Sequence, residues 1–217
     1  MFIESLENRT LFTVSPVSSA VATDLTLVHS DLLKFKADCL ANTATILADV
    51  QALKADDVQK DAVLAPLFQT LHGDLESMWA ALKADRLTEK SNVLRDESTI
   101  VTDLEQFNAD KGNAADLKTD RANLIAAHIQ LQNDEIAGLN ARLATRQADC
   151  TTLFNDMTAI TNAIGSDANA TAQVKADVGK FVTDRTNCLD TIEGDLQKLI
   201  ADRSNLVTAM TAMQSQT

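Results

Sequence analysis

The sequence contains few of the residues that interrupt helices or start tight turns. Its 217 residues include two prolines, six glycines, one tryptophan and no tyrosine. Proline and glycine are the residues least compatible with a helix interior, so their scarcity permits long helices. The dipeptides Asn-Gly and Asp-Gly, which favour β-hairpins, do not occur, so a β-sheet is not expected.

Cysteine is also scarce. The three cysteines, Cys39, Cys150 and Cys188, show no Cys-x-x-Cys spacing, which argues against a zinc site or a redox-active dithiol. An odd number allows at most one internal disulfide with one thiol left over, and the sequence leaves open whether any two are bonded. All three lie among apolar residues, so we expect them to act as buried structural side chains.

A net positive charge and long apolar runs are absent as well. The formal net charge is −12 and the sequence pI is about 4.6. Binding to nucleic acid through a basic face is therefore not expected, and adsorption to anionic lipid is disfavoured for the same reason. No uninterrupted apolar run approaches the roughly 18 residues of a membrane span, so no transmembrane segment is expected.

What the sequence does have is aspartate at regular helical spacing. A step of seven residues is two helical turns and a step of eleven is three, so aspartates at such steps lie on one helix face. Two rows share the steps seven, eleven and seven, and a third row steps by eleven, eleven, seven and seven. The rows are Asp31, Asp38, Asp49 and Asp56; Asp177, Asp184, Asp195 and Asp202; and Asp74, Asp85, Asp96, Asp103 and Asp110.

Apolar residues flank these aspartates at fixed offsets, which predicts a domain of long amphipathic helices. We expect helices at 19–64, 66–110, 113–164 and 168–214, within a single domain that covers 18–217. Short connections between long helices force antiparallel neighbours. Because seven plus eleven residues make five turns of about 3.6 residues, the prediction is all-α: an elongated, coiled-coil-like, up-down-up-down four-helix bundle with little supercoil.

The helix ends follow from start and stop signals. Residues 111–113 (Lys-Gly-Asn) and 165–167 (Gly-Ser-Asp) each combine a stop with a residue that can cap the next helix. The first break falls between 54 and 66, where Asp57 offers a cap and Pro66 offers a first-turn proline. A break near Pro66 is favoured, because it makes the first two helices equal in length.

The same pattern predicts which apolar side chains form the core. They repeat beside the aspartates on one stripe of each helix. In the first helix they are Val28, Leu32, Phe35, Cys39, Ile46, Val50 and Leu53, and in the second Leu71, Leu75, Met78, Leu82, Val93, Ile100, Leu104 and Phe107. In the third they are Leu117, Leu124, Leu131, Leu139, Leu143, Leu153 and Ile160, and in the fourth Val174, Val178, Phe181, Cys188, Ile192, Leu196, Leu199 and Leu206.

The first 17 residues differ from the rest and lack the helical pattern. Within residues 4–13, Leu6, Glu7, Arg9 and Leu11 match a short motif of the form L-E-x-R-x-L-L-S. The segment resembles the motif that opens many predicted exported and cell-surface proteins of planctomycete-type bacteria. The resemblance implies an extracellular or cell-surface location and leaves open whether residues 1–17 are cleaved. The alternative is a cytoplasmic protein with a flexible N-terminus.

The sequence shows no constellation typical of catalysis or of metal binding. No glutamate has a histidine three residues later, as a di-metal carboxylate bundle requires. Neither a Gly-rich phosphate loop nor a Gly-x-Ser-x-Gly motif occurs. Of His29, His72 and His128, only His29 and His128 are expected at one level, where a two-histidine site is the alternative to surface positions. We therefore expect no catalytic, cofactor-binding or metal-ligating residues.

The aspartate rows are the most distinctive feature. Beside an apolar seam, such positions usually form solvated or partner-matching flanks. Four arginines directly follow an aspartate, and we expect them to pair with aspartates of neighbouring helices. They are Arg86, Arg121, Arg185 and Arg203. Calcium binding is the alternative, although calcium takes about six to eight oxygens, usually from one loop.

These observations favour a non-enzymatic structural or interaction protein. We expect an exported, acidic helical rod that acts as a spacer or assembly unit, with a protein partner or further copies of itself. The alternative is an amphipathic bundle that binds lipid or another apolar surface, and an enzyme ranks last.

Overall fold

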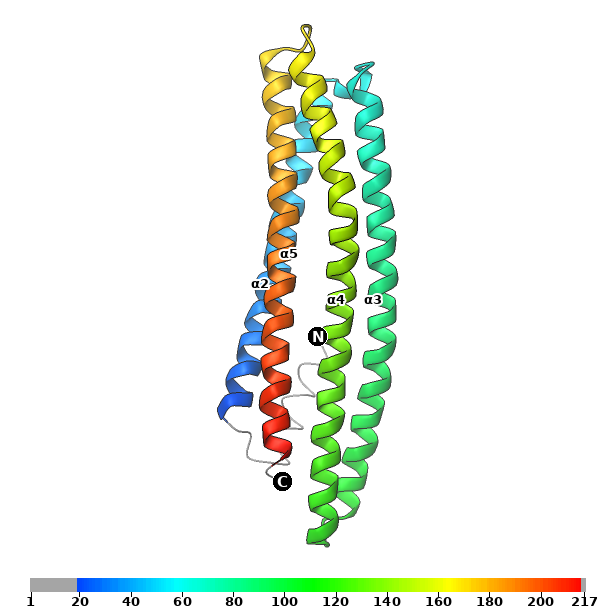
Figure 1. The fold of residues 1–217 in the computed structure, drawn as a ribbon, viewed down its shortest axis with the longest axis vertical. Helices are drawn as coiled ribbons and strands as arrows, with labels where there is room; N and C mark the ends of the chain where they lie inside the picture. Colours follow the sequence, from blue (N-terminus) through cyan, green and yellow to red (C-terminus); the bar gives the residue numbers. More distant parts are fainter. Residues whose placement is uncertain (1–18, 216–217) are drawn as a thin grey trace. The chain divides into compact units, whose positions relative to one another are not determined.

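The protein is all-α in its computed structural model, which describes residues 19–215. The four long helices are α2 (Ser19–Ala55), α3 (Leu64–Ala109), α4 (Ala114–Ser166) and α5 (Ala172–Gln214), and the short 3₁₀ helix η1 (Val58–Lys60) lies between α2 and α3 (Figure 1). No strand occurs within residues 19–215. The predicted four-helix bundle is confirmed.

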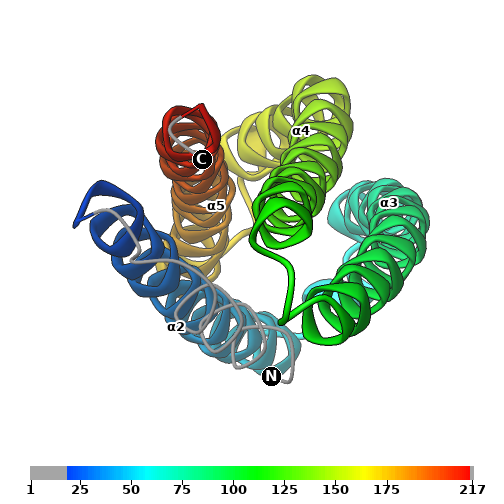
Figure 2. The ribbon, with the colours of Figure 1, turned by 90° about the horizontal axis from the view of Figure 1, so that it is seen from below.

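The helices pack as antiparallel neighbours. Figure 2 shows α5 beside both α2 and α4, and α3 beside α4. Contacts between α2 and α5 include the ion pair of Lys34 with Asp195 at 2.5 Å, and contacts between α3 and α4 include that of Arg95 with Asp134 at 2.6 Å. An increase in residue number along one helix is matched by a decrease along its neighbour, as short connections require.

The chain divides into two compact units, a division that the sequence did not predict. Unit 1 comprises the described residues up to Asp31, Asp85–Ala141, and the described residues from Lys198 onward. Unit 2 comprises Leu32–Ala84 and Arg142–Gln197. Each unit therefore contains a part of all four helices, and the limits of the units fall inside helices rather than in loops.

Each unit has its own apolar core. Removal of such side chains from water is the main favourable term in folding, about 1.5–3 kcal/mol for each fully buried leucine or isoleucine. Buried residues of the unit 2 core are Leu53, Val58, Leu64, Leu71, Met78, Leu82, Leu153, Met157, Ile160, Ile164, Val178, Phe181 and Leu189. A cluster in unit 1 contains Val93, Ile100, Leu124, Ala127 and Leu131.

Most residues predicted for the core are buried. Exceptions are most frequent on α2, where Phe35 and Ile46 are half-buried although Val28 and Leu53 are buried. The core stripe of α2 is therefore less fully covered than the stripes of the other helices.

The first helix ends earlier than predicted. It stops at Ala55 rather than at 64, and Asp57 adopts a left-handed backbone conformation with φ 58°. Asp61 then caps α3, since its Oδ1 accepts hydrogen bonds from the backbone N–H groups of Val63 and Leu64, both at 2.8 Å. Pro66 lies in the first turn of α3, where a missing N–H costs nothing.

The two later connections lie where they were predicted, except that the last helix begins later in the sequence. Asn113 caps α4, because its side-chain oxygen accepts a hydrogen bond from the N–H of Ala115 at 3.1 Å. The fourth helix begins at Ala172 rather than at 168. Asp167 bonds the N–H of Asn169 in a turn, and Thr171 supplies the cap through the N–H of Val174 at 3.2 Å. A competing side-chain turn therefore delays the helix.

Candidate functional site

The aspartate rows of α2 and α5 face each other. Both rows have steps of seven, eleven and seven, and in an antiparallel pair of helices these steps place every aspartate opposite a counterpart. The carboxyls interact in four pairs: Asp31 with Asp202, Asp38 with Asp195, Asp49 with Asp184, and Asp56 with Asp177. The equal spacing of the two rows thus has a structural cause, which is contact between the rows.

Lysines bridge three of these four pairs. In each case the lysine ammonium lies between an aspartate four residues later on its own helix and an aspartate of the facing helix. Lys34 Nζ donates to Asp38 and Asp195, both at 2.5 Å. Lys180 similarly bridges Asp184 and Asp49, and Lys198 bridges Asp202 and Asp31. The facing aspartates Asp31, Asp49 and Asp195 are buried, which makes these pairs part of the helix interface.

In the pair of Asp31 with Asp202, the two carboxyls respond oppositely to their environment. Burial, and then the interaction with Asp202, raise the pKa of Asp31, whereas the interaction with Asp31 lowers the pKa of Asp202. Such a pair holds one proton more readily than two isolated carboxylates do. Burial also raises the pKa of Asp56, Asp96, Asp120 and Asp156, which interact with Asp177, Asp134, Asp110 and Asp74, respectively.

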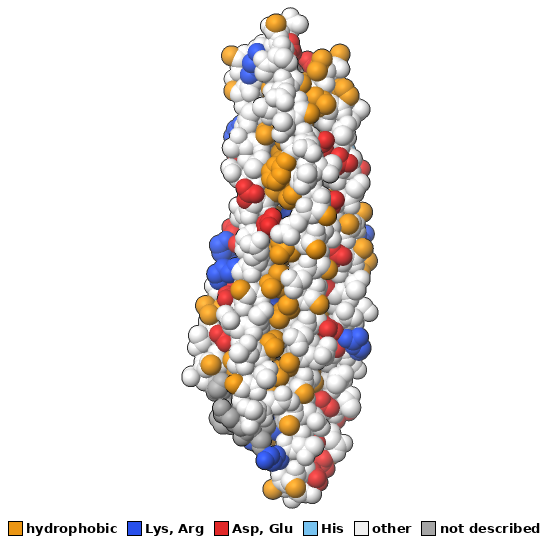
Figure 3. Space-filling model, in the orientation of Figure 1, with side chains coloured by type: hydrophobic (Ala, Val, Ile, Leu, Met, Phe, Trp, Pro, Cys, Tyr) orange, Lys and Arg blue, Asp and Glu red, His pale blue; other side chains and the backbone are white. Residues whose placement is uncertain are grey.

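These carboxylates are not grouped as a metal site. Within residues 19–215, no group of three or more histidine, cysteine, aspartate or glutamate side chains is placed to hold a metal ion. The face in Figure 3 shows acidic side chains spread along the surface rather than gathered in one patch. A calcium site needs more oxygens than one pair of aspartates supplies.

The arginines do not pair with aspartates as predicted. Arg203 is buried and donates to Gln132 Oε1 at 2.5 Å and to Glu135, not to an aspartate. Burial raises the pKa of Glu135, and the Arg203 charge opposes that rise. Arg185 has no hydrogen-bond or ion-pair partner among the described residues, and its Nε is buried.

The histidines and cysteines do not form a joint site. His128 is buried, its Nδ1 donates to the Leu124 carbonyl at 2.8 Å, and burial lowers its pKa. His29 is exposed, so the two residues predicted at one level differ in environment. Cys39, Cys150 and Cys188 form no disulfide within residues 19–215.

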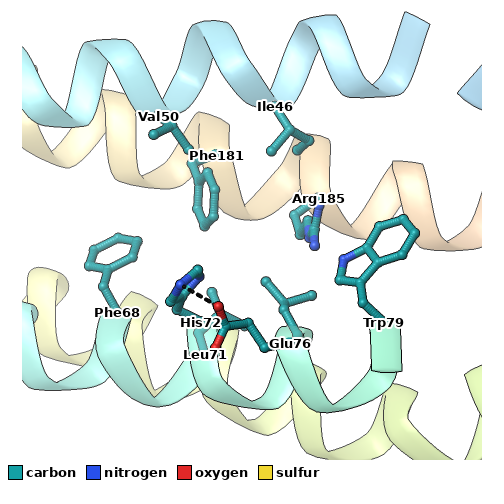
Figure 4. Close-up of a pocket in the computed structure, with 10 residues that line it drawn as sticks. Ile46, Val50, Phe68, Leu71, His72, Glu76, Trp79, Phe181 and Arg185 are labelled. Atoms are coloured by element: carbon teal, nitrogen blue, oxygen red, sulfur yellow. Dashed lines mark ion pairs between the residues drawn. The ribbon is translucent and has the colours of Figure 1, made fainter. Parts of the chain in front are cut away.

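Unit 2 contains an apolar groove between α2, α3 and α5. It has a volume of about 350 Å³ beside α5 and continues into a second hollow of about 470 Å³. Side chains of α2 and α5 point toward those of α3 across it (Figure 4). The unit 2 groove is lined by Ile46, Val50, Phe68, Leu71, His72, Leu75, Glu76, Trp79, Phe181 and Arg185.

Two further rows of apolar residues lie on the outside of α2 and α3. On α2 the leucines of the row are 53%, 73% and 57% exposed in chain order, with an exposed alanine between each two. On α3 the large residues are 60%, 54% and 43% exposed, with an exposed serine between each two. The α2 outer row is Leu33, Ala37, Leu40, Ala44 and Leu47, and the α3 outer row is Leu87, Ser91, Leu94, Ser98 and Val101.

The alternating steps of four and three residues in these outer rows are those of a coiled-coil seam. Isolated exposed leucines are common on protein surfaces and need no explanation, but a contiguous apolar stripe marks an interaction surface. The sequence analysis assigned one apolar stripe to each helix and missed these rows. A second count of seven-residue steps, started from Leu33 and Leu87, would have found both.

The chain has no match among known proteins: no family model, no curated protein and no solved structure is similar to it. Among the described residues, no helix is both long enough and apolar enough to span a membrane.

Proposed function

We propose that the protein is a non-enzymatic interaction protein that assembles with further copies of itself through its two outer rows. The observation that carries the proposal is the exposed Leu/small pattern at coiled-coil spacing on α2 and on α3. A seam of this kind is covered by a second helix in stable coiled coils. A second copy of the chain provides such helices.

The α3 outer row matches a second copy of itself in an antiparallel arrangement. Leu94 is its centre, and Leu87 and Val101 lie seven residues away on either side. With Leu94 against the partner's Leu94, the exposed Lys90 of each copy lies opposite Ser98 of the other, one residue from Glu97. Neither Lys90 nor Glu97 has an ion-pair partner among the described residues, so the pairing supplies both with opposite charges.

The α2 outer row is also self-complementary. Leu40 is its centre, with Leu33 and Leu47 seven residues away. Residues 39–48 contain no charged side chain, so no local like-charge repulsion opposes a second copy of this segment despite the net charge of −12. With Leu40 against the partner's Leu40, Leu33 of each copy faces Leu47 of the other, so leucines cover leucines along the row.

Two self-complementary rows on one chain have a consequence for assembly. One row lies in unit 2 and the other in unit 1. Each copy then contacts one neighbour through α2 and another through α3, and such a contact pattern builds an open chain of subunits. This supports a role as an assembly unit.

The proposed location is extracellular or at the cell surface. It rests on residues 4–13 alone, which lie outside the described residues, and on their resemblance to an N-terminal motif of exported proteins. Fractionation of cells that express the full chain, with mass spectrometry of its N-terminus, tests the location separately from assembly.

The assembly proposal predicts the sizes of four proteins in sedimentation velocity over a range of concentrations. The wild type is expected to form species larger than dimers. In the proposed pairs, Leu94 and Leu40 each lie against the same residue of a second copy. Leu94→Glu or Leu40→Glu therefore places two negative charges against each other and blocks one of the two interfaces, so each variant is expected to stop at the dimer. The double variant is expected to remain monomeric. Both leucines are more than half exposed, so the fold tolerates these changes.

Thr99→Glu is the matched control, because it adds the same charge on another exposed position of α3 and should assemble like the wild type. A wild type that stays monomeric at every concentration contradicts the proposal, as does a double variant that assembles normally. If the wild type is monomeric and Leu40→Glu weakens its binding to lipid vesicles, the alternative function, binding to a lipid surface, replaces the assembly proposal.

A further inference from the structure

The unit 2 groove combines an apolar lining with one half-buried cation, Arg185, whose buried Nε has no hydrogen-bond partner among the described residues. Phe68 of α3 and Phe181 of α5 meet edge to face at a ring separation of 5.6 Å. Ile46 and Val50 approach from α2 in the same view (Figure 4). The volume of about 350 Å³ lies within the range of small-molecule sites, roughly 300–1,000 Å³.

Arg185 sits in this lining and points toward α3, opposite Trp79 (Figure 4). Burial lowers the pKa of Arg185, and no carboxylate of the described residues opposes that effect. A buried charge without a counterion is strongly unfavourable in a protein. A guanidinium is also the side chain best suited to hold a carboxylate, through two parallel hydrogen bonds.

We propose that the unit 2 groove binds a single-chain amphiphilic carboxylate, such as a fatty acid, with the carboxylate on Arg185 and the alkyl chain along Phe68 and Phe181. One guanidinium matches one negative charge. The apolar lining continues beyond Phe68 into the second hollow, past Val50 and Leu53, which gives the alkyl chain an apolar path.

The other charged groups at the groove leave this site available to an anion. Glu76 lies at the rim with its side chain 71% exposed, and its Oε1 is 3.3 Å from His72 Nε2 rather than on Arg185. Cys188, which interacts electrostatically with Arg185, is on the same helix one turn away. Lys54 lines the second hollow and adds positive charge at its end.

Trp79 gives a direct readout, since it is the only tryptophan of the chain and lines the groove. The probes are dodecanoate and dodecanol, which share an alkyl chain and differ in the carboxylate. Titration of the full-length protein is expected to change the Trp79 fluorescence with both. Dodecanoate should bind about tenfold to a hundredfold more tightly, because a hydrogen-bonded charge contributes that much.

Arg185→Met is expected to remove the preference for dodecanoate over dodecanol. The variant should also melt at a higher temperature than the wild type without ligand, because a half-buried charge without a counterion is gone. Lys175→Met removes a charge from an exposed position of the same helix and should keep the preference. Circular dichroism verifies that both variants fold.

The proposal is overturned if neither probe changes the Trp79 fluorescence, or if the wild type binds dodecanol as tightly as dodecanoate. It is also overturned if Arg185→Met keeps the preference for dodecanoate. Because these measurements use the groove and not the outer rows, their outcome is independent of whether the protein self-assembles.

Discussion

Replacement of Arg203 by methionine is expected to lower the free energy of unfolding by about 3–5 kcal/mol at neutral pH, since it leaves Glu135 buried without its cation. Arg203 and Glu135 are nearly inaccessible to solvent, with side chains 8% and 13% exposed. Gln132 accepts a further hydrogen bond from Arg203, so the substitution also removes one hydrogen bond of a buried amide. Urea denaturation followed by circular dichroism measures the loss.

The loss should shrink as the pH falls, because protonation neutralises the stranded Glu135. Glu89 also raises the pKa of Glu135, which works in the same direction. The double variant Arg203→Met/Glu135→Leu should recover most of the wild-type stability, because apolar side chains replace the buried ion pair at little cost. Arg86→Met, at an exposed position of α3, is the control. An Arg203→Met variant within about 1 kcal/mol of the wild type would contradict this role.

Mild acidification is expected to raise the melting temperature by several degrees, unlike the usual destabilisation of proteins by acid. Six carboxyls have a raised pKa in the folded protein, so the folded state binds more protons than the unfolded state between their folded pKa and the ordinary pKa. These six groups therefore stabilise the fold as the pH falls through that window, and they outnumber buried His128, whose lowered pKa makes its contribution to stability fall as the pH drops below 6.5. The six are Asp31, Asp56, Asp96, Asp120, Glu135 and Asp156.

The rise in melting temperature should reverse at lower pH. Asp38, Asp61, Asp184 and Asp202 have a lowered pKa. Their contribution to stability is present above the ordinary aspartate pKa of 3.8 and is lost as the pH falls through their folded values. We therefore expect a maximum of stability at mildly acidic pH, recorded by calorimetry in a pH series.

Asparagine substitutions attribute the acid stabilisation to particular pairs. Asp56→Asn and Asp156→Asn each replace a carboxyl by a neutral side chain of similar shape, which can still donate a hydrogen bond to Asp177 or Asp74. Each should raise the melting temperature at neutral pH and flatten the pH profile. Asp167→Asn, in the turn before α5, is the control. A melting temperature that falls steadily from neutral to acidic pH would refute the paired-carboxyl account.

The fold was predictable because its signals are local and repeated. Seven- and eleven-residue steps place Leu71, Leu131 and Leu196 on buried stripes, and all three are buried. The end of α2 was not predictable in this way, because two signals compete there. A left-handed Asp57 and an Asp61 cap ended α2 and started α3 sooner than Pro66 alone suggests.

The candidate sites depend on which faces meet, and single-helix patterns do not determine that. The matching steps of the rows that include Asp31 and Asp202 fit either solvated or partner-matching flanks, and spacing along one helix does not say which helix is the partner. Arg185 and Arg203 each follow an aspartate in the sequence, but one is left unpaired in an apolar groove and the other meets Glu135. Their different fates come from packing against other helices, which spacing along one helix cannot give.

Oxidative cross-linking of a Leu94→Cys variant tests self-assembly most directly. An antiparallel α3 pair centred on Leu94 places this position next to its own copy, so Leu94→Cys should form disulfide-linked dimers rapidly. Wild-type protein gives the background of the three native thiols, and Thr99→Cys, on the same helix but outside the row, should cross-link no faster than that background. Rapid dimers of Leu94→Cys alone are the predicted result, and equal rates for Leu94→Cys and Thr99→Cys would contradict it.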